Sequence, residues 1–225
     1  RLRQRHQRLQ VLRGDLRVLI GTGTGRSFCS GYHIGAIGKG SGGDHSSASE
    51  GAFERLTDRM ENFRLPTICA LNGGVYGGAT DLALACDFRI GIAGMQMFMP
   101  AARLGIHYYE GGLRRYVTRL GLGAAKKLFL TAQTVDAAEL QRIGYLDEVV
   151  PPAELMPRVE ALAAQIAALA PLAVTGMKQA LNEIAEGRLD EAGMRRAVAA
   201  CMASDDIKEG LAAFAEKRRP VFQGR

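Results

Sequence analysis

Residues 66–90 read PTICALNGGVYGGATDLALACDFRI, and the class of the fold can be inferred from them. The stretch opens with a continuous apolar run at 67–71, which is typical of a strand buried on both faces. Asparagine and glycines at 72–78 predict a tight turn, and residues 80–86 have the composition of a helix. Apolar residues then alternate with arginine and glycine over 88–92, which indicates another strand. A strand, a helix and a strand in this order predict an α/β fold with a largely parallel sheet.

The same pattern continues on both sides of this stretch. Residues 18–20 form a short apolar run before a glycine-rich turn, which predicts a further buried strand. After Gly121, nearly all residues outside 145–150 show the residue pattern of helices. The last helix is expected to have Ser204 as its N-cap and the basic residues 217–219 in its last turn, the order that a helix dipole favours. The sequence thus predicts a sheet-bearing core followed by a helical tail.

Length and composition limit the class of protein. The chain has 225 residues, which is enough for one sizeable core. Apolar residues make up 47% and charged residues 23%, which excludes a disordered, coiled-coil or collagen-like chain. No apolar run approaches the roughly 18 residues that a membrane span needs. The four cysteines are widely spaced and follow no secretory segment, so we expect reduced thiols and a cytoplasmic protein.

Glycines make the turn at 73–78 suitable for a ligand. The backbone there can be approached closely, and amides at the start of the following helix attract negative charge. A tight turn without a ligand explains the same residues equally well. A second turn of small residues, at 22–31, follows another strand. Neither turn has the spacing of a P-loop or of a dinucleotide-binding fingerprint.

Both turns also carry the motifs of a known family. Residues 17–33, RVLIGTGTGRSFCSGYH, resemble the first signature of the enoyl-CoA hydratase/isomerase (crotonase) family, and residues 66–90 resemble the second. Residues 111–121 and 204–220 are similar to later family segments, in the same order along the chain. The resemblance implies an α/β, crotonase-like ββα spiral core over 1–165 and a C-terminal helical trimerisation segment over 166–225. It also implies a homotrimer or a dimer of trimers, with the first family strands preceding Arg1.

The resemblance further implies a substrate and a binding site. Family members bind an acyl-CoA thioester and place its carbonyl oxygen between two backbone N–H groups, which stabilise an enolate-like charge. Carried over position by position, these donors are the amides of Tyr32 and Gly78. No metal or redox cofactor is expected, because coenzyme A enters as part of the substrate and the thioester is the electron sink. The implied CoA or substrate contacts are Ser30, Gly31, Gly77, Tyr109, Phe214 and Lys217, the last two reaching a neighbouring subunit's CoA. A core aromatic and a helix-end charge explain Phe214 and Lys217 as well. His33 stands where relatives usually have aspartate, and it is either a surface or structural histidine or a group that orients a water or the substrate.

The acid and base residues depart from the family pattern. The first of two catalytic glutamates falls at Asp81, and the second falls at Ala101, which has no proton to exchange. Glu110 lies in the stretch from which some isomerases of the family take their base, although the closest equivalent position is Tyr109. A lone carboxylate at Asp81 or Glu110 suffices to move a double bond, so isomerisation fits better than hydration by two carboxylates. Either acid is equally well explained as a charge at a helix start.

Other functions stay open at this point. A catalytically silent acyl-CoA-binding member would keep the backbone donors, and a family decarboxylase or hydrolase would need them without the missing glutamate. The formal charge of +6 favours an anionic partner. Basic residues cluster at Arg114, Arg115 and Arg119, but no aromatic-interleaved motif accompanies them, so a nucleic-acid partner is not expected. We interpret these arginines as helix-end charges and contacts with CoA phosphates.

Overall fold

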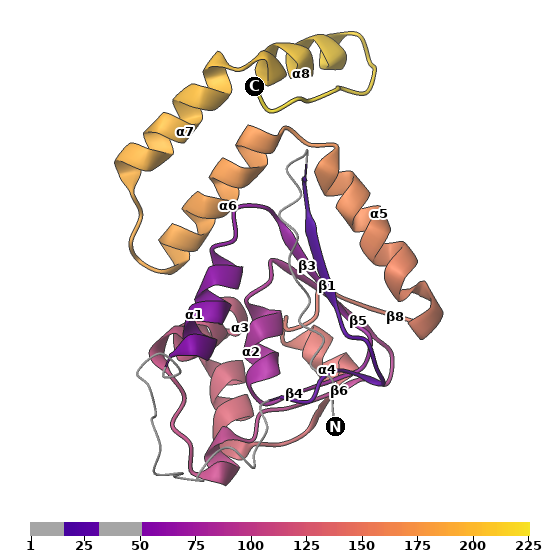
Figure 1. The fold of residues 1–225 in the computed structure, drawn as a ribbon, viewed down its shortest axis with the longest axis vertical. Helices are drawn as coiled ribbons and strands as arrows, with labels where there is room; N and C mark the ends of the chain where they lie inside the picture. Colours follow the sequence, from indigo (N-terminus) through magenta and orange to yellow (C-terminus); the bar gives the residue numbers. More distant parts are fainter. Residues whose placement is uncertain (1–15, 32–50) are drawn as a thin grey trace.

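The computed structural model describes residues 16–31 and 51–225, and Figure 1 shows how their strands and helices are arranged. Two four-stranded sheets form, in the orders β1-β3-β5-β8 and β2-β4-β6-β7. All neighbouring strands are parallel except β6 and β7, which confirms the predicted parallel sheet. The strands are β1 (Leu19–Thr22), β2 (Ser27–Cys29), β3 (Thr67–Leu71), β4 (Gly74–Tyr76), β5 (Phe88–Ile92), β6 (Gln96–Phe98), β7 (Val135–Asp136) and β8 (Glu148–Val150).

Helices connect the strands and make up most of the second half of the chain. The short 3-10 helices are η2 (Ala101–Leu104) and η3 (Pro152–Glu154). The α-helices are α1 (Ala52–Glu61), α2 (Gly78–Leu84), α3 (Glu110–Thr131), α4 (Ala137–Arg142), α5 (Leu155–Ala167), α6 (Pro171–Ala185), α7 (Glu191–Ala203) and α8 (Asp205–Ala215).

The first six strands alternate between the two sheets. β1, β3 and β5 belong to one sheet, whereas β2, β4 and β6 belong to the other. The pairs β1–β2, β3–β4 and β5–β6 are followed in the chain by α1, α2 and α3. The polypeptide therefore advances in repeated ββα turns, which is the expected spiral core.

β3 is buried over its whole length, as its apolar run predicts. It pairs with β1 at one edge and with β5 at the other. All five of its residues are buried, so both of its faces are covered as well. On one face, Ile68 of β3 and Ile90 of β5 cluster with Leu155 and Val159 of α5. Since α5 packs on this sheet, the predicted division of the chain at residue 165 falls inside a helix of the core.

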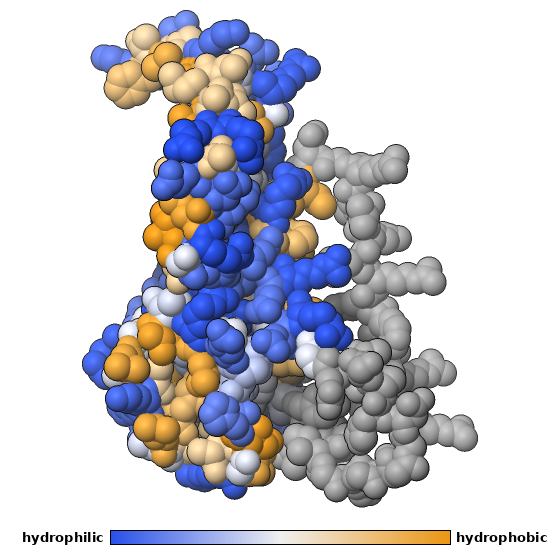
Figure 2. All heavy atoms as spheres, turned by 90° about the vertical axis from the view of Figure 1, so that its left-hand side faces the viewer, coloured by the Kyte–Doolittle hydropathy of each residue, from blue (hydrophilic) through white to orange (hydrophobic). Residues whose placement is uncertain are grey.

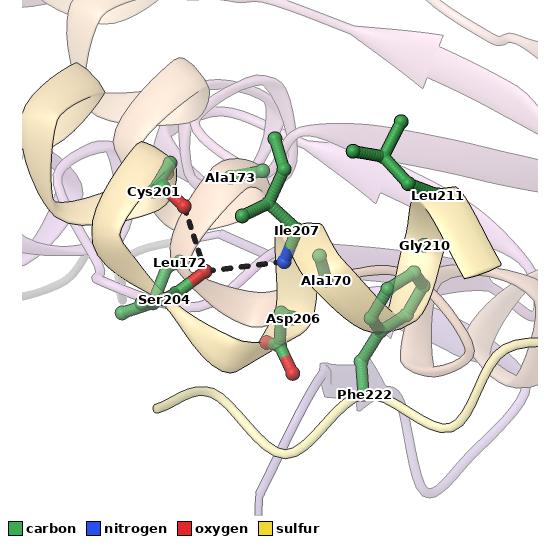
Figure 3. Close-up of a pocket in the computed structure, with 10 residues that line it drawn as sticks. All are labelled: Ala170, Leu172, Ala173, Cys201, Ser204, Asp206, Ile207, Gly210, Leu211 and Phe222. Atoms are coloured by element: carbon green, nitrogen blue, oxygen red, sulfur yellow. Dashed lines mark hydrogen bonds between the residues drawn. The ribbon is translucent and has the colours of Figure 1, made fainter.

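The C-terminal helices extend away from the sheets. Figure 1 shows α7 and α8 at the upper end of the molecule, beyond α6. Ser204 is the N-cap of α8 as predicted, and its hydroxyl accepts a hydrogen bond of 3.3 Å from the backbone N–H of Ile207. In Figure 3, Ser204 lies in an apolar hollow between α6, α7 and α8, with the Phe222 ring of the C-terminal segment on one side.

The predicted end of the last helix is wrong. α8 ends at Ala215, and no basic residue lies in its last turn. Lys217 has a left-handed φ of +54°, and the N–H of Arg218 donates a hydrogen bond to the carbonyl of Ala213. The chain therefore leaves the helix before the basic residues 217–219.

Within 16–31 and 51–225, no single helix is both long and apolar enough to cross a membrane. The pair Pro152–Ala167 and Pro171–Ala185, bent by 105°, meets the requirements of length and composition together.

Candidate functional site

The two glycine-rich turns, at 22–31 and 73–78, bend next to each other at Gly31 and Gly77. β2 and β4 are parallel neighbours, so the residues that follow them emerge at the same edge of the sheet. Gly31 has a φ of +85°, and a Cβ atom there would stand 2.7 Å from the carbonyl oxygen of Tyr76. A Cβ atom at Gly77, whose φ is +56°, would lie 3.9 Å from the Cα of Gly31. Glycine at 31 thus lets the two backbones approach each other, whereas Gly77 is favoured by its positive φ.

Hydrogen bonds fix the bend before α2. The Gly77 N–H donates to the carbonyl of Phe98 at 2.9 Å. The Gly77 carbonyl accepts the Thr80 hydroxyl at 2.7 Å, and this hydroxyl in turn accepts the buried Tyr116 phenol at 2.6 Å. Gly77 is the N-cap residue and offers no side chain, so no side chain caps α2, which begins at Gly78. The first N–H groups of a helix have no partner within it, so they can bind an anionic oxygen.

Asp81 lies one turn into α2 and is completely buried. The Nη1 atom of Arg115 lies 2.8 and 2.7 Å from its two carboxylate oxygens. The Tyr109 phenol also donates a hydrogen bond to this carboxylate. Burial raises the pKa of the Asp81 carboxyl above its ordinary value, because lost hydration outweighs the Arg115 charge and the Tyr109 hydrogen bond. The carboxylate predicted as a base is therefore enclosed by protein groups.

Arg115 is the centre of a buried charge cluster that the sequence interpretation missed. Its Nη2 atom lies 2.8 Å from Asp58 and 3.1 Å from Glu61, both on α1. Burial alone would raise the pKa of Glu61, but Arg115, together with Arg119 and Arg114, outweighs it and lowers that pKa. The spacing of Asp58 and Glu61 by three residues on one helix face is the signal that could have indicated a buried cation partner.

The interpretation of the neighbouring arginines as phosphate contacts is corrected by their partners. Arg115 has no exposed surface. Arg114 pairs with Glu61 and with Glu186 at 3.1 and 3.2 Å. Arg119 donates to the carbonyls of Leu84 and Cys86, both at 2.6 Å, where α2 ends. These cations hold α1, α2 and α3 together.

Glu110 and Asp81 lie in different surroundings. Glu110 is exposed at the first position of α3. It lines a surface hollow together with His107, Tyr108, Leu113, Arg114 and Val117, and Asp81 is not among the lining residues. Ala101, at the position of the second family glutamate, is a buried member of the apolar core at the start of η2. The structure therefore brings Asp81 next to Tyr109, and not next to Glu110.

The remaining predicted site residues are spread over the molecule. Ser30 is exposed beside the Gly31 bend, whereas Tyr32 and His33 lie outside the described residues. Phe214, with 87% of its surface exposed, and Lys217 belong to the C-terminal end of the chain. Figure 1 shows α8 well separated from α2 along the length of the molecule, so within one chain these two residues do not meet Gly78. Among the residues that the structure describes, no three His, Cys, Asp or Glu side chains are grouped to hold a metal ion.

The chain is similar to known proteins over almost its whole length. Residues 3–225 match the family described as enoyl-CoA hydratase/isomerase. A crotonyl-CoA hydratase of Syntrophomonas wolfei is 38% identical over 213 residues, which cover 91% of this chain and 80% of that protein. A carnitinyl-CoA dehydratase of Proteus mirabilis is 36% identical over 218 residues, or 94% of this chain and 83% of the relative.

Solved structures give the same result. An enoyl-CoA hydratase of Bacillus anthracis superposes with a TM-score of 0.80 at 32% identity, over 93% of this chain and 82% of that one. Similarity of sequence and of fold thus extends over almost the whole chain and most of each relative. The chain therefore belongs to the enoyl-CoA hydratase/isomerase family of enzymes.

Proposed function

We propose that this protein acts on an acyl-CoA thioester through an enolate that the backbone N–H groups of Tyr32 and Gly78 stabilise. The observation that carries the proposal is the contact between the Gly31 and Gly77 bends, which lie next to these two amides in the chain. Hydrogen bonds from Thr80 and to Phe98 hold the second bend in place. Donors fixed before the reaction lose no energy in reorganising when charge develops on the carbonyl oxygen.

The chemistry follows from the position of that charge. When a proton leaves the acyl chain, its electron pair moves to the thioester oxygen between the two N–H groups. Each donor of this kind accelerates such a reaction by roughly 10² to 10³. The thioester itself accepts the electrons, so the proposed reaction calls for neither a metal ion nor a redox cofactor.

Double-bond isomerisation suits the site better than hydration by two carboxylates. Ala101 contributes only a methyl group where a second carboxylate would be needed. Asp81 lies near the Gly78 end of α2, whereas Glu110 lines another hollow. One proton acceptor suffices to take a proton from C2 and to return it at C4.

A panel of acyl-CoA esters tests the reaction. Purified protein is incubated with but-3-enoyl-, crotonyl- and 3-hydroxybutyryl-CoA, and the products are identified by mass spectrometry and NMR. We expect but-3-enoyl-CoA to become crotonyl-CoA faster than crotonyl-CoA gains water. Faster hydration would overturn the isomerase assignment, as would binding without turnover. Adding malonyl-CoA to the panel also detects loss of CO₂ or release of free CoA. Either result would replace the isomerase assignment, by a decarboxylase in the first case and by a hydrolase in the second.

The C-terminal helices support the proposed homotrimer or dimer of trimers. Large apolar side chains are exposed along α6, α7 and α8, namely Met177, Leu181, Ile184, Val198, Met202, Leu211 and Phe214. Figure 2 shows pale and orange side chains at the upper end of the molecule, where α7 and α8 lie. Apolar surface of this extent is typical of a protein interface. In a trimer, Phe214 and Lys217 would reach the CoA of a neighbouring subunit.

Sedimentation tests the assembly. We expect the protein to sediment as a trimer or a hexamer, and we expect the double variant Leu181→Glu and Met202→Glu to shift it toward the monomer. The double variant Arg195→Glu and Lys208→Glu, which changes exposed cations on α7 and α8, is the control. A wild-type protein that is monomeric at micromolar concentration would contradict the proposal.

A further inference from the structure

A chain of hydrogen bonds runs through Tyr109 beneath the start of α2. The Tyr109 phenol donates to the Asp81 carboxylate and lies 2.9 Å from the Thr57 hydroxyl. Arg115 completes the chain on the far side of Asp81. Thr57, Asp81 and Arg115 are completely buried, whereas Tyr109 keeps part of its surface exposed. Of these four residues, Tyr109 is therefore the one that a bound molecule can touch.

Tyr109 also lies close to the proposed oxyanion donor. The Phe53 ring meets the Tyr109 ring edge to face, with 6.1 Å between their centroids. The tip of the same Phe53 ring lies 3.0 Å from the place where Gly78 would carry a Cβ atom. Asp81 is on the first turn of the helix that Gly78 begins, so Tyr109 contacts this turn directly through Asp81 and is joined to Gly78 through the Phe53 ring. An acyl chain bound at Gly78 would therefore have Tyr109 and Phe53 as neighbours.

We infer that Tyr109 is the catalytic residue that exchanges a proton with the acyl chain, and that Asp81 acts through it. The inference rests on the proposed function. In the forward step the C–H bond at C2 breaks, its proton binds the Tyr109 oxygen, and its electron pair moves to the thioester oxygen. At the same time the phenolic proton passes to the Asp81 carboxylate. The reverse transfer delivers a proton to C4, so the phenol and the carboxylate are restored and no other reactant is needed. Asp81 is then a positioning residue and proton store.

The charges around Asp81 suit such a transfer. Arg115 faces Asp81 directly, and the carboxylates of Asp58 and Glu61 share this guanidinium. Burial favours the neutral form of Asp81 and so makes its carboxylate a better proton acceptor. Burial, followed by the Asp81 charge, raises the pKa of Tyr109, so the phenol carries its proton at neutral pH. A protonated phenol between substrate and carboxylate is the form that the relay requires.

The variant Tyr109→Phe removes the relay and keeps the ring. Two rates are measured, namely but-3-enoyl-CoA isomerisation by NMR and the uptake of deuterium from D₂O at C2 of butyryl-CoA by mass spectrometry. The second rate reports enolate formation whatever the overall reaction is. We expect Tyr109→Phe to lower both rates by roughly 10²-fold or more, with acyl-CoA affinity retained in calorimetry.

Tyr108→Phe is the matched control. The Tyr108 ring packs on the Tyr109 ring, with centroids 4.6 Å apart. Its hydroxyl is buried and has no hydrogen-bond partner among the described residues. Removing that oxygen should leave both rates unchanged. Equal losses in Tyr108→Phe and Tyr109→Phe would show that the effect is not specific to the hydroxyl that contacts Asp81, and this would overturn the relay.

A fluorinated tyrosine separates proton transfer from structure. Replacement of Tyr109 by 3,5-difluorotyrosine keeps the shape and lowers the phenol pKa, so we expect the alkaline limb of the pH–rate profile to move to lower pH. A purely structural Tyr109 would leave this limb in place. Asp81→Asn should abolish the transfer while thermal unfolding confirms that the variant is folded. If it does not fold, the fluorotyrosine profile alone decides.

The outcomes distinguish this inference from the proposed function. A wild-type protein that neither isomerises but-3-enoyl-CoA nor exchanges the C2 protons of butyryl-CoA would overturn both. A wild-type protein that performs these reactions, with Tyr109→Phe equally fast and the fluorotyrosine profile unshifted, would overturn the relay and leave the enolate mechanism standing.

Discussion

Arg115 and Asp81 form an ion pair with no exposed surface, in which one guanidinium nitrogen lies 2.8 and 2.7 Å from the two carboxylate oxygens. The residues are 34 positions apart in the sequence and belong to α3 and α2. The pair joins the helix that begins at Gly78 to the helix behind it. It therefore holds Asp81 in the proposed site, and it also contributes to the stability of the core.

Replacing Arg115 by methionine should destabilise the protein strongly. The substitution leaves the buried Asp81 and Glu61 carboxylates without their shared cation. Removal of one partner of a buried pair typically costs about 3–5 kcal/mol, most of it the energy of the charge left behind. We expect this loss in the free energy of unfolding, measured by urea titration near pH 7.

The control is Arg195→Met. Arg195 forms an i,i+4 pair with Glu191, and both side chains are 73% exposed. Because water screens such a pair, its loss should leave the urea midpoint nearly unchanged. A similar small effect for Arg115→Met would mean that the buried cluster does not hold α1, α2 and α3 together.

The fold could be predicted well because its signals are local. The apolar run of β3, the glycines after it and the N-cap Ser204 each act through neighbouring residues, and the structure has them as expected. The end of α8 was mispredicted because charge order alone was used. The helix ends at Ala215, and Lys217 then has a left-handed φ. No glycine at position 217 indicated this conformation in the sequence.

The site could be predicted only in part. The two bends were identified, and the structure places Gly31 beside Gly77. The surroundings of Asp81 could not be derived, because Tyr109 and Arg115 reach it from 28 and 34 positions further along the chain. Such contacts depend on how α3 packs against α2. A basic cluster in the sequence gives no indication of whether its side chains face solvent or buried carboxylates.

The Gly78 amide can be removed without breaking its helix. Gly78 is the first residue of α2, a position that accepts proline because the N–H there has no partner in the helix. Gly77 before it has a ψ of −134°, which avoids the helical conformation that a following proline disfavours. We expect Gly78→Pro to lower kcat/KM by roughly 10²- to 10³-fold in the isomerisation assay, because one oxyanion donor is lost.

Gly78→Ala controls for the added atoms. Its Cβ would stand 3.0 Å from the tip of the Phe53 ring, which is the free end of a side chain and can shift. The alanine variant keeps the N–H and should lose much less activity than the proline variant. Equal losses would show that the space beside Phe53 matters and the hydrogen bond does not.

Thr80→Val should loosen the bend before α2. Valine has the shape of threonine but leaves the Tyr116 phenol and the Gly77 carbonyl without their shared hydroxyl. Each buried polar group left unpaired costs about 1–3 kcal/mol, and we expect a loss in this range or somewhat above it in urea titration. Thr118→Val removes an exposed hydroxyl that only bonds back to its own helix, so it should have little effect. Matching midpoints for the two variants would contradict the role of Thr80.

Acid should weaken the contact between Val221 and α8. The Glu209 carboxylate accepts hydrogen bonds from Arg218 at 2.6 and 2.8 Å and from the Val221 N–H at 2.8 Å. Arg218, with the Val221 N–H, lowers the pKa of Glu209 from 4.5 to about 2. A carboxyl group whose pKa is lowered by folding stabilises the folded form at every pH above the pKa that it has in the unfolded chain. For Glu209 this contribution is lost as the pH falls from about 4.5 to about 2.

Hydrogen exchange at the Val221 amide measures this weakening. After correction for the intrinsic rate, we expect protection to be constant from pH 7 to pH 5 and to fall progressively below pH 4.5. In Glu209→Gln the charge is absent at every pH, so protection should be lower at pH 7 and should not fall further on account of this group. The amides within β3, which lie far from Glu209 in the fold, provide the reference for global unfolding. If Val221 in the wild-type protein loses protection only together with β3, the segment is held by the whole fold and not by the Glu209–Arg218 pair.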